Sequence, residues 1–191
     1  GIDGWRLDVA FCVKHPFWKA WRSHVKAINP AAYLTAEVID PIDVLEPYLR
    51  GDEFDAVMNY NVAFACAEFF IDREKRITAG AFDARLRALR EAFDPAVAYV
   101  QQNLIDSHDS NRVASHIVNP DGVPYRDWPA YHPASKAVDN PDYDPRKPNA
   151  DEVAIQKLIV LFLMTYVGAP MIYYGDEVGL WGANDPCCRK P

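Results

Sequence analysis

Short apolar runs of strand length recur along the chain, and stretches with apolar residues at helical spacing separate them. The runs predict strands at residues 1–10, 33–39, 54–60, 98–105 and 169–174. Apolar residues that recur every three or four positions predict helices at 15–28, 61–71, 81–93 and 151–166, with a short helix or turn at 41–49. Strands that alternate with helices predict a parallel α/β sheet. The pattern alone does not choose between a barrel and an open sheet.

Charged side chains stand at or just after the ends of the predicted strands. Arg6 and Asp8 are two residues apart in the first strand, so their side chains point to the same side. Glu37 interrupts the end of the second strand, and His108-Asp109 follows the fourth. A single pair of opposite charges on an apolar strand is most simply a structural ion pair, because unpaired buried charge is costly. The repetition at several strand ends favours a shared site, since the C-terminal ends of parallel strands carry the chemistry of α/β barrels.

Three carboxyl groups at one edge of a sheet can divide acid and base roles between them. Like charges that lie close together raise one another's pKa, so one group stays protonated while another is ionised. Glycoside cleavage needs this division, and a pair about 5 Å apart gives retention through a covalent intermediate. A metal-dependent hydrolase, a lyase and purely structural charges are the alternatives that spacing leaves open.

Composition excludes some classes of function. The chain has 191 residues, of which 50% are hydrophobic, and this is enough for one core. The net charge of −7 and the lack of a basic stripe argue against a nucleic-acid partner. The longest apolar run, 158–167, is shorter than the roughly 18 residues that a membrane span needs. The absence of such a run favours the cytoplasm or periplasm over a membrane. The sequence identifies neither the compartment nor the oligomeric state. The four cysteines form no C-x-x-C motif.

Residues 119–150 differ from the rest of the chain. They contain seven prolines, with Asp, Asn and Tyr between them. A connection of this length and composition is more than a simple link between two elements. We therefore predict a functional surface loop or lid in this region.

Three segments resemble sequence signatures of the α-amylase family of glycoside hydrolases (family 13). GIDGWRLDVA, the Glu of YLTAEVID, and NLIDSHDSNR are similar to its second, third and fourth signatures, in the same order and at similar spacing. FDAVMNY and GAPMIYYGDEVGLWGANDP resemble two further barrel strands, and the closest similarity is to the cyclomaltodextrinase, neopullulanase and maltogenic amylase branch. The resemblance implies a (β/α)8 TIM barrel, of which the chain holds approximately strands four to eight.

The resemblance also implies roles for single residues. Asp8 matches the nucleophile, Glu37 the general acid/base, and Asp109 the third carboxylate, which grips sugar hydroxyls. Arg6 matches the arginine that orients the nucleophile, and His108 matches a histidine that binds the sugar at the bond being cleaved.

Three further residues are expected to bind substrate. Asn59 and Tyr60 lie at the end of the predicted strand 54–60, and Arg112 follows the His-Asp pair. Aromatic side chains at such positions stack on sugars or simply fill the core. We therefore expect these three residues to line the same rim as Asp8 and Glu37.

The implied activity is retaining hydrolysis of α-glucosidic linkages in α-glucans or maltooligosaccharides. Transglycosylation, action on sucrose or trehalose, and a non-catalytic carbohydrate-binding role are the alternatives. Phe11-Cys12 stands where this branch commonly has Asn-Glu, and Ala36 stands where Gly usually precedes the acid/base, so linkage preference is left open. Calcium binds to some members of the family with ligands that often lie outside these residues, and we assign no cofactor or metal site here.

The resemblance leaves out much of a complete enzyme. The first three barrel strands, the first signature, an inserted domain and a C-terminal β-domain have no counterpart in the chain. We therefore expect residues 1–191 to be the C-terminal portion of a TIM-barrel catalytic domain, inactive or poorly folded in isolation.

Overall fold

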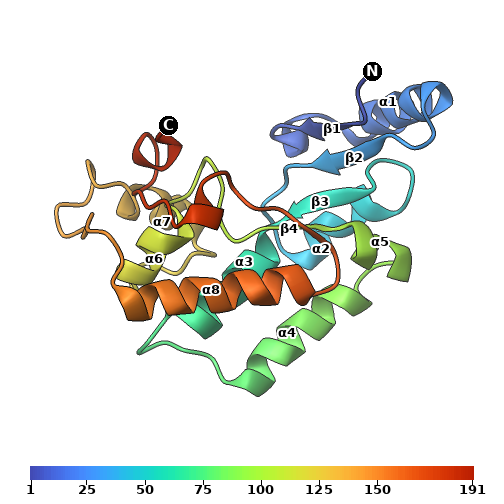
Figure 1. The fold of residues 1–191 in the computed structure, drawn as a ribbon. Coiled ribbons are helices and arrows are strands. Elements are labelled where there is room, and N and C mark those ends of the chain that lie inside the picture. Colours follow the sequence, from blue (N-terminus) through green and yellow to red (C-terminus); the bar gives the residue numbers. More distant parts are fainter. The chain divides into compact units, whose positions relative to one another are not determined.

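A computed structural model describes all residues from 1 to 191, in five strands and eight α-helices (Figure 1). The strands are β1 (Gly4–Leu7), β2 (Tyr33–Ala36), β3 (Ala56–Asn59), β4 (Gln102–Asn103) and β5 (Ala169–Pro170). The helices are α1 (His15–Ile28), α2 (Ile42–Leu45), α3 (Tyr60–Cys66), α4 (Ala79–Glu91), α5 (Pro95–Val100), α6 (Val113–Val118), α7 (Trp128–Ala134) and α8 (Ala150–Thr165). The chain divides into two compact units, the first made of residues 1–61, 86–103 and 167–169 and the second of residues 62–85, 104–166 and 170–191.

The five strands form one sheet in the order β1-β2-β3-β4-β5. β1 pairs with β2, β2 with β3, and β3 with β4, each time in parallel. The predicted parallel α/β arrangement is therefore confirmed. The order runs from β1 to β5 without returning to β1, so the sheet does not close into a barrel within these residues.

The burial of the first two strands differs. Leu34, Thr35 and Ala36 of β2 are buried, as the continuous apolar run predicts for a strand covered on both faces. The apolar residues of the strand predicted at 1–10 indicate that this strand is buried, and this prediction is wrong, because Trp5 is 46% exposed and Ile2 is exposed as well. The reason is position, since β1 is at the edge of the sheet and has only β2 as a neighbour.

Helix α1 covers the start of the sheet and matches its predicted bounds. Pro16 occupies the first turn, where its missing N–H costs no hydrogen bond. Trp18 on its inner face is buried, donates its indole N–H to the carbonyl of Ala10 at 3.0 Å, and packs edge-on against Phe54 at 5.1 Å. This aromatic contact joins α1 to the core beneath β2 and β3.

The strand predicted at 98–105 is mostly wrong. Residues Pro95–Val100 form helix α5, and only Gln102–Asn103 form β4. The Asp94 side chain accepts the N–H of Ala96, and Pro95 sits in the first turn, which together start a helix. The helix cap therefore outweighs the β-branched residues of this segment, which favour a strand.

The strand predicted at 169–174 is shorter than expected. Ala169 donates its N–H to the carbonyl of Gln101 at 2.8 Å, but Pro170 has no N–H and β5 ends there. The chain then turns at Gly175, whose φ of 92° lies in the left-handed region that favours glycine.

The region 119–150 is not entirely a loop, because it contains the seven-residue helix α7. Helix α8 begins where the region ends, with a reciprocal cap between Asn149 and Glu152. Phe162 on α8 packs against Phe70 and Phe82 in the second unit, with ring centroids 5.8 and 5.3 Å away. None of the helices is both long enough and apolar enough to cross a lipid bilayer.

Candidate active site

The ends of β1 and β2 bring Arg6, Asp8 and Glu37 together in the first unit. One terminal nitrogen of the Arg6 guanidinium contacts an Asp8 carboxylate oxygen, and the other lies 2.5 Å from Glu37 Oε1. Glu37 Oε2 accepts the backbone N–H of Val9 at 2.9 Å. The Glu37 N–H donates to the carbonyl of Leu7 at 2.9 Å, which extends the β1–β2 pairing to the site. Two adjacent strand ends thus hold the two carboxyl groups on one cation.

The two carboxyl groups have different surroundings. The Asp8 side chain is 70% exposed, whereas that of Glu37 is only 7% exposed. Burial raises the pKa of Glu37, and the nearby Asp8 carboxylate adds to the rise, while the N–H of Val9 and the charge of Arg6 oppose it. Glu37 is therefore suited to hold a proton, and the accessible Asp8 is suited to meet a substrate.

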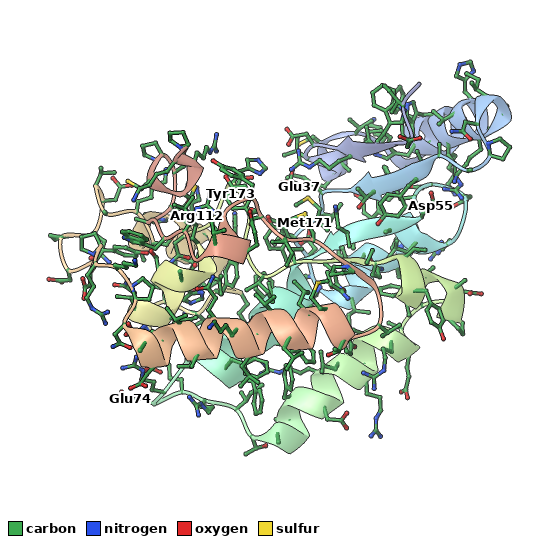
Figure 2. The ribbon with its side chains drawn as sticks, in the orientation of Figure 1. Glu37, Asp55, Glu74, Arg112, Met171 and Tyr173 are labelled. Atoms are coloured by element: carbon green, nitrogen blue, oxygen red, sulfur yellow. The ribbon has the colours of Figure 1, made fainter.

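Glu37 lies at the C-terminal end of its strand, as the sequence predicts. Figure 2 shows Glu37 and Asp55 at opposite ends of the β2–β3 pair. Asp55 lies just before β3 and is held by Arg22 at 2.8 Å and Lys26 at 2.9 Å. The carboxylate at this N-terminal edge belongs to a structural ion-pair network that joins α1 to the sheet.

Asn59 and Tyr60 occupy the core of the first unit. Asn59 is 7% exposed and donates its amide to Asn103 Oδ1 at 2.9 Å, and Asn103 in turn donates to the carbonyl of Val167 at 2.8 Å. A Cβ at Gly168 would overlap Asn103 Nδ2, so only glycine fits beside this amide chain. Tyr60 is 1% exposed. The structure thus places both side chains inside the unit, and the expectation that they bind substrate stays a prediction.

His108 and Asp109 lie together in the second unit, on the turn that follows residue 107. His108 Nε2 is 3.1 Å from Asp109 Oδ2, and both side chains are partly exposed. Ser107 Oγ accepts the N–H of Asp109 at 3.1 Å, and Ser110 Oγ accepts the N–H of Ser107 at 3.0 Å. Two serine hydroxyls therefore fix the turn from within.

The C-terminal segment closes over this turn. Arg189 donates its Nε–H to the carbonyl of His108 at 3.0 Å and lies 3.3 Å from Asp109 Oδ1, and the thiol of Cys188 contacts the same carbonyl. Sequence reasoning missed Arg189, because an exposed cation 80 positions away in a loop carries no spacing signal. The tail contributes a positive charge beside the expected third carboxylate.

Arg112 is fully buried in the second unit. Its Nη1 donates to the carbonyl of Tyr174 at 2.6 Å and lies 3.1 Å from Asp176 Oδ1. The guanidinium also lies over the ring of Tyr173, 4.4 Å from its centroid, and Figure 2 shows these two side chains together. Arg112 has 0% exposure, so it has protein partners and no open side for a ligand in this structure.

A second carboxyl completes the surroundings of Arg112. Asp106 forms a hydrogen bond with Asp176, and burial together with the neighbouring Asp176 raises the pKa of Asp106 well above its usual range. Asp106 Oδ2 also accepts the N–H of Val113. Two carboxyl groups that share a hydrogen bond need one proton between them, so Asp106 holds a proton and Asp176 pairs with the cation.

The structure thus brings together Arg6, Asp8 and Glu37 in one unit and His108 and Asp109 in the other. Convergence of the two groups stays a prediction. No cluster of three or more His, Cys, Asp or Glu side chains that could hold a metal ion is found in residues 1–191.

The chain resembles known proteins along its whole length. Residues 1–127 match the family model described as "Alpha amylase, catalytic domain". Cyclomaltodextrinase from a Bacillus species is 40% identical over 194 residues, which covers 100% of this chain and 27% of the relative. Neopullulanase 2 from Thermoactinomyces vulgaris is 38% identical over 191 residues, which covers 100% of this chain and 26% of the relative.

Solved structures agree with these relatives. A cyclomaltodextrinase structure superposes with a TM-score of 0.75 at 38% identity and covers 100% of this chain and 26% of that one. The cyclic alpha-maltosyl-(1-->6)-maltose hydrolase from Arthrobacter globiformis, in complex with that sugar, gives a TM-score of 0.73 at 33% identity and covers 99% of this chain and 34% of that one. The chain therefore spans about a quarter of the length of its curated relatives, which are glycoside hydrolases. Because the family model matches residues 1–127, which is more than half of the chain and includes Asp8, Glu37 and Asp109, this chain belongs to the family of α-amylase catalytic domains.

Proposed function

We propose that residues 1–191 carry the catalytic carboxyl groups of an enzyme that hydrolyses α-glucosidic linkages in α-glucans or maltooligosaccharides with retention of configuration. One observation carries the proposal, namely that Arg6 holds Asp8 and Glu37 together. Glu37 also hydrogen-bonds to Asp8. Carboxyl groups this close leave no space for the water molecule that inverting enzymes place between theirs, about 6.5–9.5 Å apart.

The mechanism assigns the acid role to the buried group and the nucleophile role to the accessible one. Glu37 donates its proton to the glycosidic oxygen as that bond breaks, and an Asp8 oxygen bonds to the anomeric carbon. Glu37 then removes a proton from water, whose oxygen displaces Asp8 and restores the original configuration. Arg6 keeps its contact with Asp8 while the negative charge of this carboxylate is consumed and regenerated.

His108 and Asp109 are proposed to grip hydroxyl groups of the sugar at the bond being cleaved. Their partly exposed side chains and the rigid Ser107–Ser110 turn support this role, because hydrogen bonds to ring hydroxyls need fixed geometry. For Asn59, Tyr60 and Arg112 we propose support of the site from inside the fold.

We propose that the chain is the C-terminal portion of a TIM-barrel catalytic domain, with a long proline-rich loop at about 119–150. The similarity to strands within much longer relatives supports this assignment. Experiments on activity therefore use a polypeptide that contains these residues within a complete barrel.

The experiment that tests the mechanism traps the covalent intermediate. Glu37→Gln should lower turnover of maltotriose by about 10²–10⁴-fold, which is typical for loss of an acid/base. With α-maltosyl fluoride, whose leaving group needs little protonation, the same variant should accumulate a maltosyl adduct that peptide mapping places on residue 8.

Asp8→Asn is the matched variant and should form no adduct with the fluoride. The initial product of the unsubstituted enzyme should be the α-anomer by NMR. A β-anomer as the first product, or an adduct on another residue, would refute the retaining mechanism.

Transglycosylation is a second candidate, in which a sugar hydroxyl replaces water in the final step. An exposed aromatic side chain favours it, because Phe11 is 56% exposed two residues after Val9, which binds Glu37. Aromatic rings are common platforms for sugar acceptors. Products longer than maltotriose from a maltotriose substrate would support this route, and their loss in Phe11→Ser would assign it to this ring.

A further inference from the structure

A cavity of about 340 Å³ lies in the second unit, between α6, α7 and the proline-rich region. Asn111, His116, Tyr131, Ser135 and Tyr143 form its walls. None of the eight residues assigned to the candidate active site lines it. Its volume falls at the lower end of the range of small-molecule sites.

The walls combine polar and apolar side chains, and the buried polar groups are neutral and held in place. Tyr131 donates its hydroxyl to Asn111 Oδ1, and Asn111 donates its amide to Tyr143 Oη at 3.1 Å. Ser135 Oγ accepts the amide of Asn184 at 3.0 Å. All five of these side chains are buried, so the donors and acceptors that face the cavity are fixed before any ligand arrives.

His116 is the wall residue that lacks a partner. It is 8% exposed, and its ring packs against Tyr125 edge-on at 5.5 Å and against Tyr131 at 5.6 Å, without a hydrogen bond to either imidazole nitrogen. Burial lowers the pKa of His116 to about 4, so at neutral pH the ring offers one N–H donor and one acceptor. Neither imidazole nitrogen is among the fully buried atoms that lack a partner, so the ring stays accessible from the cavity that it lines. A ligand in the cavity can therefore replace solvent as its hydrogen-bonding partner.

The chemistry of the lining selects the class of ligand. No Lys or Arg lines the cavity, which disfavours an anion, and the only charged lining residue is the exposed Asp142, which is too little to hold a cation. Amide, hydroxyl and imidazole groups disfavour a wholly apolar molecule, while Pro120, Val123 and Ala134 offer apolar surface for the face of a sugar ring. A neutral compound with several hydroxyl groups matches both the lining and the size.

We propose that this cavity is an accessory saccharide site that binds one or two neutral sugar units, with His116 and Asn111 as hydrogen-bonding partners. The class of ligand follows from the cavity, and the assignment to glucose units of an α-glucan rests on the proposed function. Asn111 is two residues from Asp109, so an occupied site also stiffens the turn that carries the expected third carboxylate.

The test follows the imidazole signals by NMR in a barrel-complete protein that carries Asp8→Asn, so that the sugar is not consumed. Addition of maltose should shift the C–H signals of His116 in a saturable way, and His132, which is on α7 but does not line the cavity, serves as the unshifted control. His116→Gln identifies the signal. Asn111→Ala should weaken binding about ten-fold, which is the loss of one hydrogen bond.

A substitution at the entrance of the cavity tests the site without changing the buried side chains of its walls. A Cβ at Gly122, which lines the cavity, would meet nothing within 4 Å. Gly122→Trp should therefore block the cavity and abolish the His116 shift, whereas the matched Gly122→Ala should leave it unchanged.

The outcomes separate this inference from the proposed function. A shift of His108 with maltose and none of His116 would refute the accessory site and leave the hydrolase proposal standing. A saturable shift of His116 in a protein whose Asp8 form hydrolyses no glucan would support the site and refute the hydrolase proposal. A shift with maltose that persists in Gly122→Trp would also overturn the site.

Discussion

The buried pairing of Arg112 with Asp176 gives a prediction that depends on burial rather than on catalysis. Arg112→Met keeps much of the side-chain volume and removes the charge. The two partners have side-chain exposures of 0% and 5%. We expect this substitution to be among the most destabilising in the second unit.

The magnitude follows from the geometry. Arg112 Nη1 is 3.1 Å from Asp176 Oδ1, and two unit charges with centres about 4 Å apart interact by about 4 kcal/mol at an effective dielectric constant near 20. Removal of one partner from a buried pair typically costs about 3–5 kcal/mol, because the other charge is left without compensation. We therefore expect the free energy of unfolding to fall by about 3–5 kcal/mol at pH 8.

The loss should shrink as the pH falls. Burial raises the pKa of Asp176, and the charge of Arg112 opposes that rise. Without Arg112 the carboxyl takes up a proton more readily, so acid neutralises the uncompensated charge. The penalty is therefore full above the raised pKa of Asp176 and decreases below it.

Urea unfolding followed by tryptophan fluorescence measures the effect in a barrel-complete protein at pH 8 and pH 5. Lys19→Met is the control, because Lys19 forms an exposed pair with Asp52 and should cost less than about 1 kcal/mol. Adding Asp176→Asn to Arg112→Met should restore part of the lost stability at pH 8. A loss below about 1 kcal/mol for Arg112→Met, or no recovery in the double variant, would refute the reasoning about the buried charge.

Two further predictions concern proton binding. Arg6→Gln removes the cation that lowers the pKa of Glu37, so the alkaline limb of the plot of kcat/KM against pH should move to higher pH. The control Lys19→Gln should leave this limb in place. An unmoved limb in Arg6→Gln would count against Glu37 as the acid. Burial lowers the pKa of His116 from 6.5 to about 4, so as the pH falls this histidine binds a proton in the unfolded chain before it does so in the folded one. The free energy of unfolding should therefore fall by about 3 kcal/mol between pH 6.5 and pH 4. Urea midpoints across this range should show the loss, His116→Gln should lack it, and equal slopes in both proteins would contradict the buried neutral ring.

Local signals predicted the elements whose own residues decide their structure. Helix α1 was predictable because its apolar positions, its first-turn proline and its end at Asn29 all agree. Strand β2 was predictable because a short, nearly continuous apolar run is typical of a strand that is buried inside a sheet. Helix α6 was missed, because all six of its residues are buried and a helix covered on every side has no amphipathic period to detect.

The site was predictable to the extent that it depends on strand geometry. Alternation along a strand places Arg6 and Asp8 on one side, and the parallel partner strand adds Glu37. The surroundings of Arg112 were not predictable, because its counter-charge lies 64 positions away and its burial depends on how that segment folds back. Sequence patterns report the direction of a side chain, whereas exposure depends on distant segments.

The chain uses the same arrangement of charges twice, and exposure separates the two uses. Arg6 joins Asp8 and Glu37, and Arg112 meets Asp176, which shares a hydrogen bond with Asp106. In both places at least one of the two acids comes from a segment that is distant from the Arg in the sequence. In the fold Asp8 is largely open to solvent and can receive a substrate, while Arg112 is sealed under two tyrosine rings and can only stabilise. The accessibility of one carboxylate oxygen, more than the pairing of charges, is therefore what makes the first arrangement a candidate for catalysis and the second part of the framework.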